Sequence, residues 1–267
     1  MTLQIWIDGK LVPKAEATVS VYDHGLLYGD GVFEGIRVYG TRIFKMGQHL
    51  ARLWESADRI RLTIPYSREE IVAAMRATIS ANGLVDAYIR LVVTRGAGTL
   101  GLDPRKCPRP GVFCIADTIQ LYPQELYDNG MKVVVAQRPR IPVACLDPSI
   151  KSLNYLNNIL AKLEAIDANV LEAIMLNTEG FVAECTGDNI FAIKTVAGVT
   201  TIVTPPPSAG LLNGVTRRFV MNEIAPSLGF RVVEKLFRLD ELYESDEVFL
   251  TGTAAEVIGV NAIGLRW

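Results

Sequence analysis

The segment IKSLNYLNN, residues 150–158, places one lysine, one tyrosine and three asparagines among aliphatic side chains. A solvated surface does not require so many aliphatic residues, and an ordinary hydrophobic core excludes an ammonium group. A helix near 154–168 is predicted to begin just after this lysine, because leucines recur there at helical spacing. The position of Lys151, just before a predicted helix and among aliphatic residues, therefore calls for an explanation.

Two interpretations of Lys151 remain open from the residues around it. The amine can act as a nucleophile when an apolar setting or a nearby cation lowers its pKa from about 10.4. Alternatively, its aliphatic stem can pack at a seam between domains while the charged end reaches water. Other motifs in the chain have to decide between the two.

The composition is that of a globular protein, with 49% hydrophobic and 21% charged residues among 267. The formal net charge is −2 and no basic block is present, so we expect neither nucleic acid nor a membrane as a partner. No apolar run reaches the roughly 20 residues of a membrane span, and the N-terminal residues do not resemble a signal peptide. The four cysteines lack CxxC spacing and only two histidines occur, so we expect free thiols, no metal site and a cytoplasmic location.

The first region of the chain alternates short strands and helices. Asp8-Gly9 and Gly40-Thr41 are turn pairs between strand-like residues, and they predict two β-hairpins. The capping-box pattern at 67–70 predicts a helix that ends near Asn82-Gly83. The other elements expected here are a helix over 50–60, strands over 87–94 and 112–116, and a long Gly/Pro-rich loop over 95–110.

The second region is rich in strands and follows the polar, irregular residues 118–130. Its seven predicted strands are MKVVVAQ, EAIMLN, FVAE, NIFAIK, TTIVTP, RVVEKLF and EVFLTG. Two predicted helices, near 154–168 and 216–228, interrupt them, and the first is expected to bury Leu156, Leu160 and Leu163. We therefore predict an α+β protein with a domain at 1–117, an interdomain loop at 118–130 and a β-rich domain at 131–267.

Two segments of the second region could hold charged parts of a ligand. In VAECTGDNIF, residues 182–191, Glu184 ends a strand and would suit a protonated ring nitrogen if it faces inward. In LLNGVTRRF, residues 211–219, Gly214 precedes a helix whose first N–H groups would suit a phosphate. Ordinary turn and capping chemistry accounts for both segments equally well when each is taken alone.

Two further segments combine glycine with hydroxyl or aromatic side chains. FLTGTAAE, residues 249–256, ends a strand in small residues whose N–H groups could hold a second anion, or simply form a β-turn. HGLLYGDGVFEGIR, residues 24–37, has four glycines around Tyr28 and Phe33, which suits either a pocket or a flexible surface loop. An amine, an acid, a phosphate cradle and a second anion site together match the needs of pyridoxal 5′-phosphate (PLP).

The chain-ordered motifs resemble those of the class IV (fold-type IV) PLP-dependent aminotransferases, and most closely the branched-chain amino acid aminotransferases. The motifs that carry the resemblance are HGLLYGDGVFEGIR, HLARL, YIR, IKSLNYLNN, AECTGDN, GVTR and GTAAE, and they span nearly the whole chain. The resemblance implies a two-domain enzyme with a small N-terminal domain, a larger β-rich C-terminal domain and PLP at the domain interface. It also implies a homodimer or a higher homo-oligomer.

The resemblance assigns a role to each matching position. Lys151 would form the internal Schiff base, Glu184 would pair with the pyridinium nitrogen, and Tyr155 would bind the ring hydroxyl. The other cofactor-binding positions are Arg52, Val215, Thr216, Gly252 and Thr253 around the phosphate, and Leu212 and Gly187 against the ring faces. The substrate-binding positions are Tyr28, Phe33, Gly35, Tyr88, Arg90 and Ala254, with Tyr28 reaching across a dimer interface.

The implied reaction is transamination between leucine, isoleucine or valine and 2-oxoglutarate, by a ping-pong mechanism through pyridoxamine phosphate. A D-amino acid aminotransferase or an aminodeoxychorismate lyase of the same fold is an alternative, as is a non-catalytic PLP carrier. The chain departs from the family at Cys185, where glycine usually follows the acid. It also ends at Trp267, before the glycine-rich segment and last helix that are typical of the family.

Overall fold

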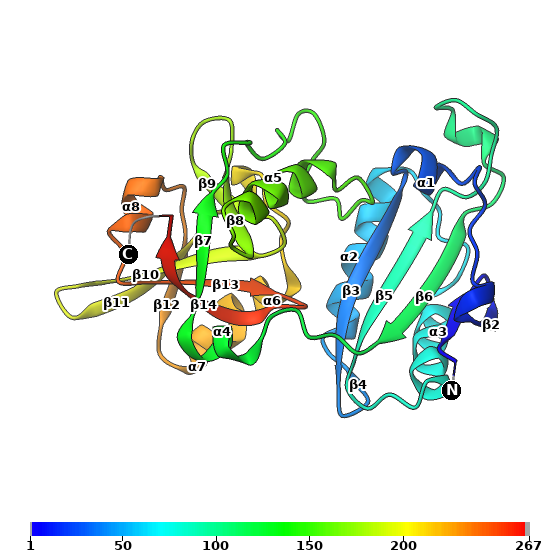
Figure 1. Cartoon of the computed structure of the whole chain (residues 1–267), viewed down its shortest axis with the longest axis horizontal. Coiled ribbons are helices and arrows are strands. Elements are labelled where there is room, and N and C mark those ends of the chain that lie inside the picture. The colour runs from blue at the N-terminus through cyan, green and yellow to red at the C-terminus, as the bar shows by residue number, and fades with distance from the viewer. Residues whose placement is uncertain (1, 265–267) are drawn as a thin grey trace. The chain divides into compact units, whose positions relative to one another are not determined.

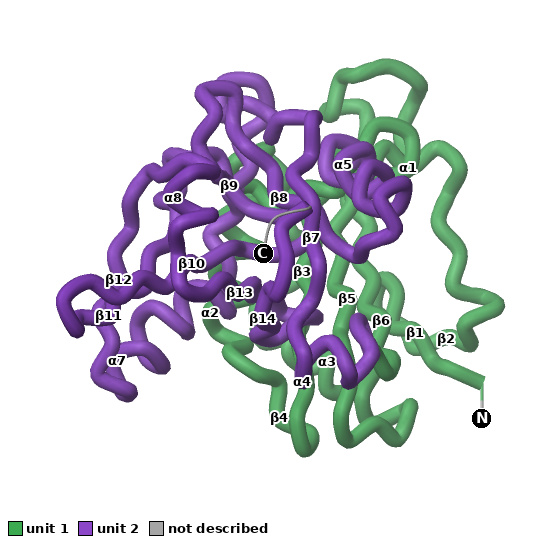
Figure 2. The backbone as a smooth tube through the Cα atoms, turned by 60° about the vertical axis from the view of Figure 1, so that its left-hand side comes forward, with its two compact units in different colours: residues 1–119, 150–155 green, residues 120–149, 156–267 purple. Residues whose placement is uncertain are grey.

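The computed structural model describes residues 2–264, which divide into two compact units. Unit 1 comprises residues 1–119 and 150–155, and unit 2 comprises residues 120–149 and 156–267 (Figure 2). The sequence placed residues 150–155 in the second region, whereas they pack with unit 1. Lys151 and Tyr155 therefore belong to the first unit, and helix α5 (Leu156–Asp167) belongs to the second.

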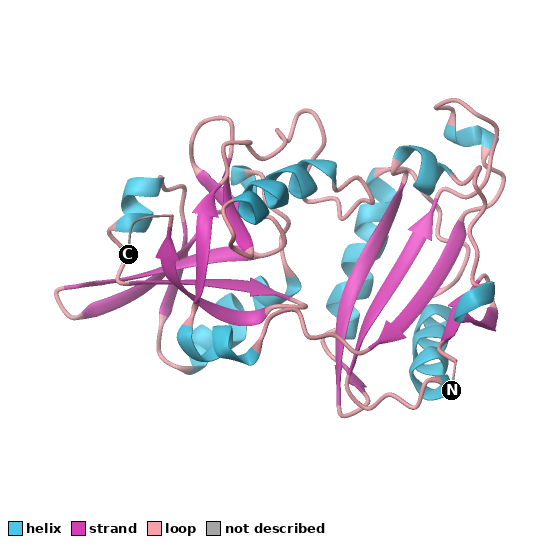
Figure 3. Cartoon of the chain, in the orientation of Figure 1, coloured by secondary structure: helices cyan, strands magenta, loops and turns pink. Residues whose placement is uncertain are grey.

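Unit 1 is a sheet of six strands in its described part, in the order β2-β1-β6-β5-β3-β4 (Figures 1 and 3). Every neighbouring pair in this sheet is antiparallel. The strands are β1 (Gln4–Ile7), β2 (Lys10–Pro13), β3 (Gly31–Tyr39), β4 (Arg42–Ile43), β5 (Ala87–Thr94) and β6 (Gly111–Asp117). The helices are α1 (His24–Tyr28), α2 (Met46–Arg59) and α3 (Arg68–Ala81), with 3-10 turns at Lys14–Glu16 and Pro104–Lys106.

The predicted local elements of unit 1 are confirmed. Both hairpin turns have two residues with positive φ, at Asp8-Gly9 and Gly40-Thr41, which is the backbone of the tight turns that join twisted strands. Ser67 and Glu70 form the reciprocal capping box at the start of α3. These features depend on neighbouring residues, so the sequence determines them without reference to the rest of the fold.

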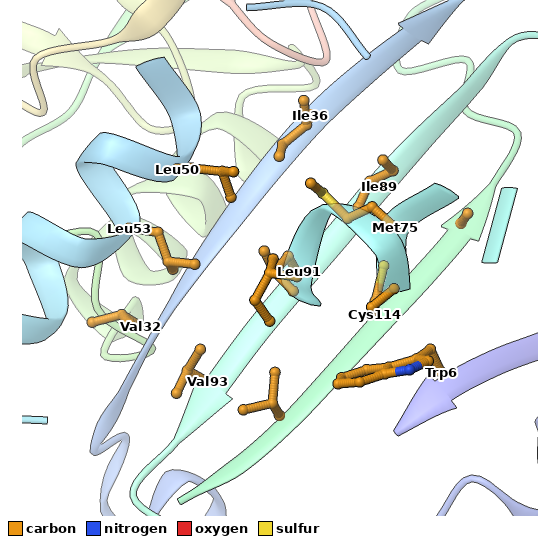
Figure 4. Close-up of a cluster of buried hydrophobic side chains, with 14 of the residues drawn as sticks. Trp6, Val32, Ile36, Leu50, Leu53, Met75, Ile89, Leu91, Val93 and Cys114 are labelled. Carbon is orange, nitrogen blue, oxygen red and sulfur yellow. The ribbon is translucent and has the colours of Figure 1, made fainter. Parts of the chain in front are cut away.

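One face of the unit 1 sheet carries the hydrophobic core. Successive side chains of a strand point to opposite faces, so Val32 and Ile36 of β3 face the core together with Leu91 of β5. Leu53 of α2 and Met75 of α3 pack against them (Figure 4). Glu34 lies between Val32 and Ile36 on this same face, so a carboxylate occupies a core position.

Residues 151–153 extend the sheet at the edge of β3. The Phe33 amide donates to the Lys151 carbonyl at 3.0 Å, and the Leu153 amide donates to the Gly31 carbonyl at 2.9 Å. The Lys151 amide donates in turn to Ser56 Oγ of α2 at 3.1 Å. The backbone that carries Lys151 is therefore fixed by both a strand and a helix of unit 1.

Unit 2 contains a sheet of eight strands within residues 120–149 and 156–264, in the order β12-β11-β10-β13-β14-β7-β8-β9. The strands are β7 (Met131–Val135), β8 (Glu172–Leu176), β9 (Val182–Cys185), β10 (Asn189–Val196), β11 (Val199–Thr204), β12 (Arg231–Glu234), β13 (Glu247–Gly252) and β14 (Glu256–Ile263). The shorter helices are α4 (Gln124–Asn129), α6 (Val215–Phe219), α7 (Ala225–Ser227) and α8 (Leu239–Tyr243). A π-helical turn at Val220–Ile224 joins α6 to α7, and a 3-10 turn lies at Pro207–Ala209.

All seven predicted strands of unit 2 are present, but three elements were not predicted. These are α4, α8 and β14, of which α4 lies in the segment 118–130 that was expected to be irregular. Within residues 2–264, no helix combines the length and the apolar character that crossing a membrane would need.

The predicted buried face of α5 is wrong. Leu156 is 60% exposed and Leu163 is 48% exposed, whereas Ala161 and Ala165 on the opposite side of the helix are buried. These alanines pack against Ala173 and Met175 of β8, and small side chains allow a helix to approach a sheet closely. Helical periodicity correctly identified a stripe, but it could not say which of two stripes faces the core.

Candidate functional site

The Lys151 amine lies in a small aromatic group of unit 1. Its Nζ donates to Tyr155 Oη at 3.1 Å and lies 4.5 Å from the centre of the Phe33 ring. The Tyr155 and Phe33 rings meet edge to face, with their centres 5.2 Å apart. A lysine that is half-buried beside a phenol has the surroundings of a chemically used amine rather than of a solvated surface charge.

The predicted substrate residues of strands β3 and β5 lie on one face of the sheet. Gly35 pairs with Arg90 in register, and the Arg90 guanidinium lies 4.5 Å from the Phe33 ring centre and 5.8 Å from that of Tyr88. A Cβ atom at Gly35 would lie 1.8 Å from Tyr88 Oη, so glycine makes room for that hydroxyl. The structure thus brings Phe33, Gly35, Tyr88 and Arg90 together beside Lys151.

Tyr28 is the predicted substrate residue of unit 1 that this group does not include. It is the last residue of α1, it is 37% exposed, and its hydroxyl accepts a hydrogen bond from the Gly101 amide at 3.0 Å. Its ring packs edge to face against His24, with the ring centres 5.0 Å apart.

Arg52 of α2 is held by a carboxylate in the core of unit 1. Arg52 Nε donates to Glu34 Oε1 at 2.6 Å and Nη2 donates to Oε2 at 2.8 Å, while His49 Nδ1 lies 2.7 Å from Oε2. Burial would raise the pKa of Glu34, but Arg52 and His49 lower it to about 2. The sequence singled out Arg52 but not Glu34 or His49, because only the folded chain brings the three side chains together.

In unit 2, Glu184 is buried near the end of β9 and is surrounded by polar groups. Arg140 Nε lies 2.9 Å from its Oε1 at ion-pair distance, and its Oε2 accepts from the Leu212 amide at 3.1 Å and from Asn189 Nδ2 at 3.2 Å. An adjacent guanidinium favours the charged form of a carboxyl group. The side chain of Cys185 lies in the hydrophobic core of unit 2, so the thiol does not crowd this carboxylate.

The polar residues of IKSLNYLNN that follow Tyr155 support this acid. Asn158 Oδ1 accepts from Arg140 Nη1 at 2.7 Å, and its Nδ2 donates to the Thr186 carbonyl at 2.8 Å. Asn157 Oδ1 accepts from the Ile141 amide at 3.0 Å. The two asparagines therefore connect α5 with the segment that carries Arg140 and with the turn after Glu184.

The glycine-containing segments of unit 2 converge on the same turn. Asn189 Nδ2 donates to the Leu212 carbonyl at 2.9 Å, and a Cβ atom at Gly214 would lie 2.1 Å from Asn189 Oδ1. A Cβ atom at Gly252 would lie 2.0 Å from Asp188 Oδ1. The structure places the other predicted residues in or beside these segments: Gly187 in the turn, Val215 and Thr216 at the start of α6, and Thr253 and Ala254 after β13.

The chain is similar over nearly its whole length to known aminotransferases. The family model described as amino-transferase class IV matches residues 31–263. The chain belongs to this family.

Two curated relatives and one solved structure illustrate the similarity. A Methanocaldococcus jannaschii protein, provisionally named a branched-chain-amino-acid aminotransferase, is 48% identical over 99% of this chain and 89% of its own length. The branched-chain-amino-acid aminotransferase of Pseudomonas aeruginosa is 41% identical over 98% of this chain and 85% of its own. The branched-chain amino acid aminotransferase of Thermobaculum terrenum, solved in its PLP form, aligns with a TM-score of 0.85 at 29% identity, covering 98% of this chain and 86% of its own.

A protein of different name is also similar to this class IV aminotransferase. The D-alanine aminotransferase of Bacillus licheniformis is 34% identical over 98% of this chain and 88% of its own length. The names of these relatives agree on an aminotransferase, while the choice of substrate has to be argued from the residues of this chain.

The aminotransferase contains a buried pair of acids that the sequence did not reveal. Glu172 of β8 accepts hydrogen bonds from the amides of Thr186 at 3.0 Å and Gly187 at 3.1 Å, and from the Thr186 hydroxyl. Burial, and then the charge of Glu172, raise the pKa of Asp188 to about 7, and Asp188 Oδ2 accepts from Tyr122 at 3.2 Å. Sequence motifs showed only a turn at 186–188, because the two acids meet through strand pairing.

Asp188→Asn should flatten the pH dependence of stability. The Asp188 pKa rises from an ordinary 3.8 to about 7 on folding, so the folded protein holds an extra proton between these values. Stability then falls as pH rises through this window, by on the order of 1–4 kcal/mol in the parent, and asparagine removes that loss. Thermal unfolding midpoints at steps from pH 4 to 8 measure it. The exposed Asp167→Asn serves as the control, and parallel curves for parent and Asp188→Asn would contradict the assignment.

Proposed function

We propose that this protein catalyses PLP-dependent transamination between branched-chain L-amino acids and 2-oxoglutarate. The observation that carries the proposal is the Lys151 amine, which lies 3.1 Å from the Tyr155 hydroxyl, in a chain of the class IV aminotransferase family. An amine with a phenol beside it and a buried, cation-supported acid are the groups that PLP requires. The printed names of the two curated relatives support the branched-chain substrate.

The residues present fit the parts of PLP. The Lys151 amine suits the aldehyde, Tyr155 suits the ring hydroxyl, and Glu184 suits the ring nitrogen because Arg140 favours its charged form. As the family resemblance implies, Arg52, Val215, Thr216, Gly252 and Thr253 would bind the phosphate, and Leu212 and Gly187 would lie against the ring faces. When bound, PLP supplies the electrophilic carbon and an electron-accepting ring.

Lys151 acts as the proton-transfer group. With PLP and an amino acid bound, the Lys151 amine would take the proton from the substrate Cα and hold it for return. Such a positioned general base contributes about 10²–10⁴-fold to the rate. Tyr155 holds that amine in position, and Glu184 keeps a proton on the ring nitrogen. A second half-reaction with a 2-oxo acid completes a ping-pong cycle through pyridoxamine phosphate.

Absorption spectra with single amino acids test this function. Each L-branched-chain amino acid should convert the visible band of the PLP-loaded protein to the near-ultraviolet band of pyridoxamine phosphate, and 2-oxoglutarate should restore the visible band. No conversion by any L- or D-amino acid would indicate a PLP carrier. Conversion by D-alanine or D-glutamate, without conversion by L-leucine, would favour a D-amino acid aminotransferase. Release of pyruvate from aminodeoxychorismate would favour the lyase.

Phe33, Tyr88 and Arg90 together would allow one site to accept both a branched aliphatic substrate side chain and the carboxylate side chain of glutamate. A branched aliphatic group buried against the aromatic rings gains about 1.5–3 kcal/mol from water exclusion. The glutamate side-chain carboxylate would lose more than this if it were buried unpaired, and Arg90 supplies the matching cation. The α-carboxylate would bind in the turn of Thr253 and Ala254, and Arg90 would then serve the side chain.

Arg90→Met should separate the two half-reactions. We expect it to lose most activity with glutamate and 2-oxoglutarate and to keep most of the leucine half-reaction, because only the former needs a cation. Stopped-flow half-reactions with each donor measure the difference. Equal losses with both donors would place Arg90 at the α-carboxylate instead.

We also propose a homodimer or a larger homo-oligomer. The α1 segment leaves Leu26, Leu27 and Tyr28 exposed, an apolar surface that a second copy would cover. Light scattering at the assay concentration should give at least twice the chain mass. A fully active monomer would contradict this proposal.

A further inference from the structure

Glu34 is a carboxylate in the hydrophobic core of unit 1. Its side chain is 0% exposed, and its neighbours on the same face of β3 are Val32 and Ile36. A charge in this position is costly unless it is paired, and both of its oxygens are committed to Arg52 and His49 of α2. A buried ion pair adds little stability over well-packed hydrophobic residues, so its presence points to a role other than holding the core together.

We propose that Glu34 and His49 are positioning residues that fix the Arg52 guanidinium for binding the cofactor phosphate. This inference rests on the proposed function and deepens it. The two parallel bonds from Nε and Nη2 use one edge of the guanidinium, which fixes its plane and its rotation about the side chain. A guanidinium held by two parallel bonds presents its remaining N–H groups in a fixed plane, whereas a guanidinium held by one bond can rotate.

Arg52 lies close to the Lys151 group. Burial lowers the pKa of Arg52 and Glu34 raises it, with smaller contributions from Tyr155 and Tyr88. Burial is the main cause that lowers the pKa of His49, and Lys151 adds a smaller contribution. Ser56, one turn further along α2, accepts the hydrogen bond from the Lys151 amide. One face of α2 therefore holds both the guanidinium and the backbone of the reactive lysine.

The charges of Glu34, Arg52 and His49 show that Glu34 does not help to attract a phosphate. Burial lowers the pKa of His49, so its ring is neutral near pH 7 and Nδ1 donates to Glu34. Glu34 is ionised and balances the charge of Arg52, which leaves the group neutral. A phosphate placed beside Arg52 would be repelled by Glu34, so the benefit of Glu34 has to come from orientation.

Repulsion of the phosphate by Glu34 and orientation of Arg52 by Glu34 predict opposite results for Glu34→Gln. If charge dominates, removing the anion strengthens phosphate binding. If orientation dominates, the neutral amide loses the two-bond fork, the guanidinium becomes mobile, and phosphate binding weakens. The sign of the change decides between them.

The test compares the binding of PLP and of pyridoxal, which lacks the phosphate, to the cofactor-free protein. We expect Glu34→Gln to weaken PLP binding by about 10- to 100-fold, as for the loss of one charge-assisted hydrogen bond, and to leave pyridoxal binding within about twofold. Inorganic phosphate should compete with PLP less well in the variant. Arg52→Lys, which keeps the charge and loses the fork, should show the same selective loss, and the double variant should be less than additive.

A matched control removes another two-bond pair of the same unit. Arg95 donates to Asp30 from Nε at 2.8 Å and from Nη2 at 2.9 Å, and Asp30→Asn should leave the ratio of PLP to pyridoxal affinity unchanged. Thermal unfolding of each cofactor-free variant verifies folding, and Glu34→Asp, which keeps the charge and disturbs the two-bond fork, carries the test if Glu34→Gln does not fold.

The outcomes separate this inference from the proposed function. A parent protein that does not bind PLP overturns both. A parent that binds PLP, with an affinity ratio that Glu34→Gln leaves unchanged or shifts towards PLP, overturns the positioning role alone.

Discussion

The pairing of residues 151–153 with the edge of β3 is the interaction on which the candidate site depends. Two backbone hydrogen bonds, one on each side of Val32, fix the chain that carries Lys151. Strand β3 then serves three purposes at once: its edge holds the lysine backbone, one face presents Phe33 and Gly35, and the other face buries Glu34. Strand geometry alone places these groups within a few residues of one another. The bond from the Lys151 amide to Ser56 adds α2 to the same arrangement.

Paired buried polar groups organise the surroundings of Glu184 in unit 2. Glu184 is surrounded by Arg140, Asn189 and the Leu212 amide, and Arg140 is in turn held by Asn158. Glu172 receives the amides of the turn that follows Glu184. A buried network of paired polar groups is rigid, so it fixes the turn that follows Glu184.

Local signals in the sequence were sufficient for most elements. The hairpin turns at Asp8-Gly9 and Gly40-Thr41 and the capping box at Ser67 depend on adjacent residues and were predicted correctly. The leucine side of α5 was predicted to be buried, but its alanine side is the buried one, because small side chains let the helix lie close to the sheet. Sequence motifs identified the candidate cofactor-binding and substrate-binding residues, but they did not identify the side chains that pair with them. Glu34, His49, Arg140, Glu172 and Asp188 meet their partners only through strand register and helix packing, which sequence spacing does not reveal.

The central claim is that the lysine held at the edge of β3 is the covalent attachment point for PLP. Borohydride reduction of the PLP-loaded protein, followed by proteolysis and mass spectrometry, tests this most directly. We expect one phosphopyridoxyl group, on the peptide that contains Lys151. Attachment to a different lysine, or no attachment while the visible band of bound PLP persists, would contradict it.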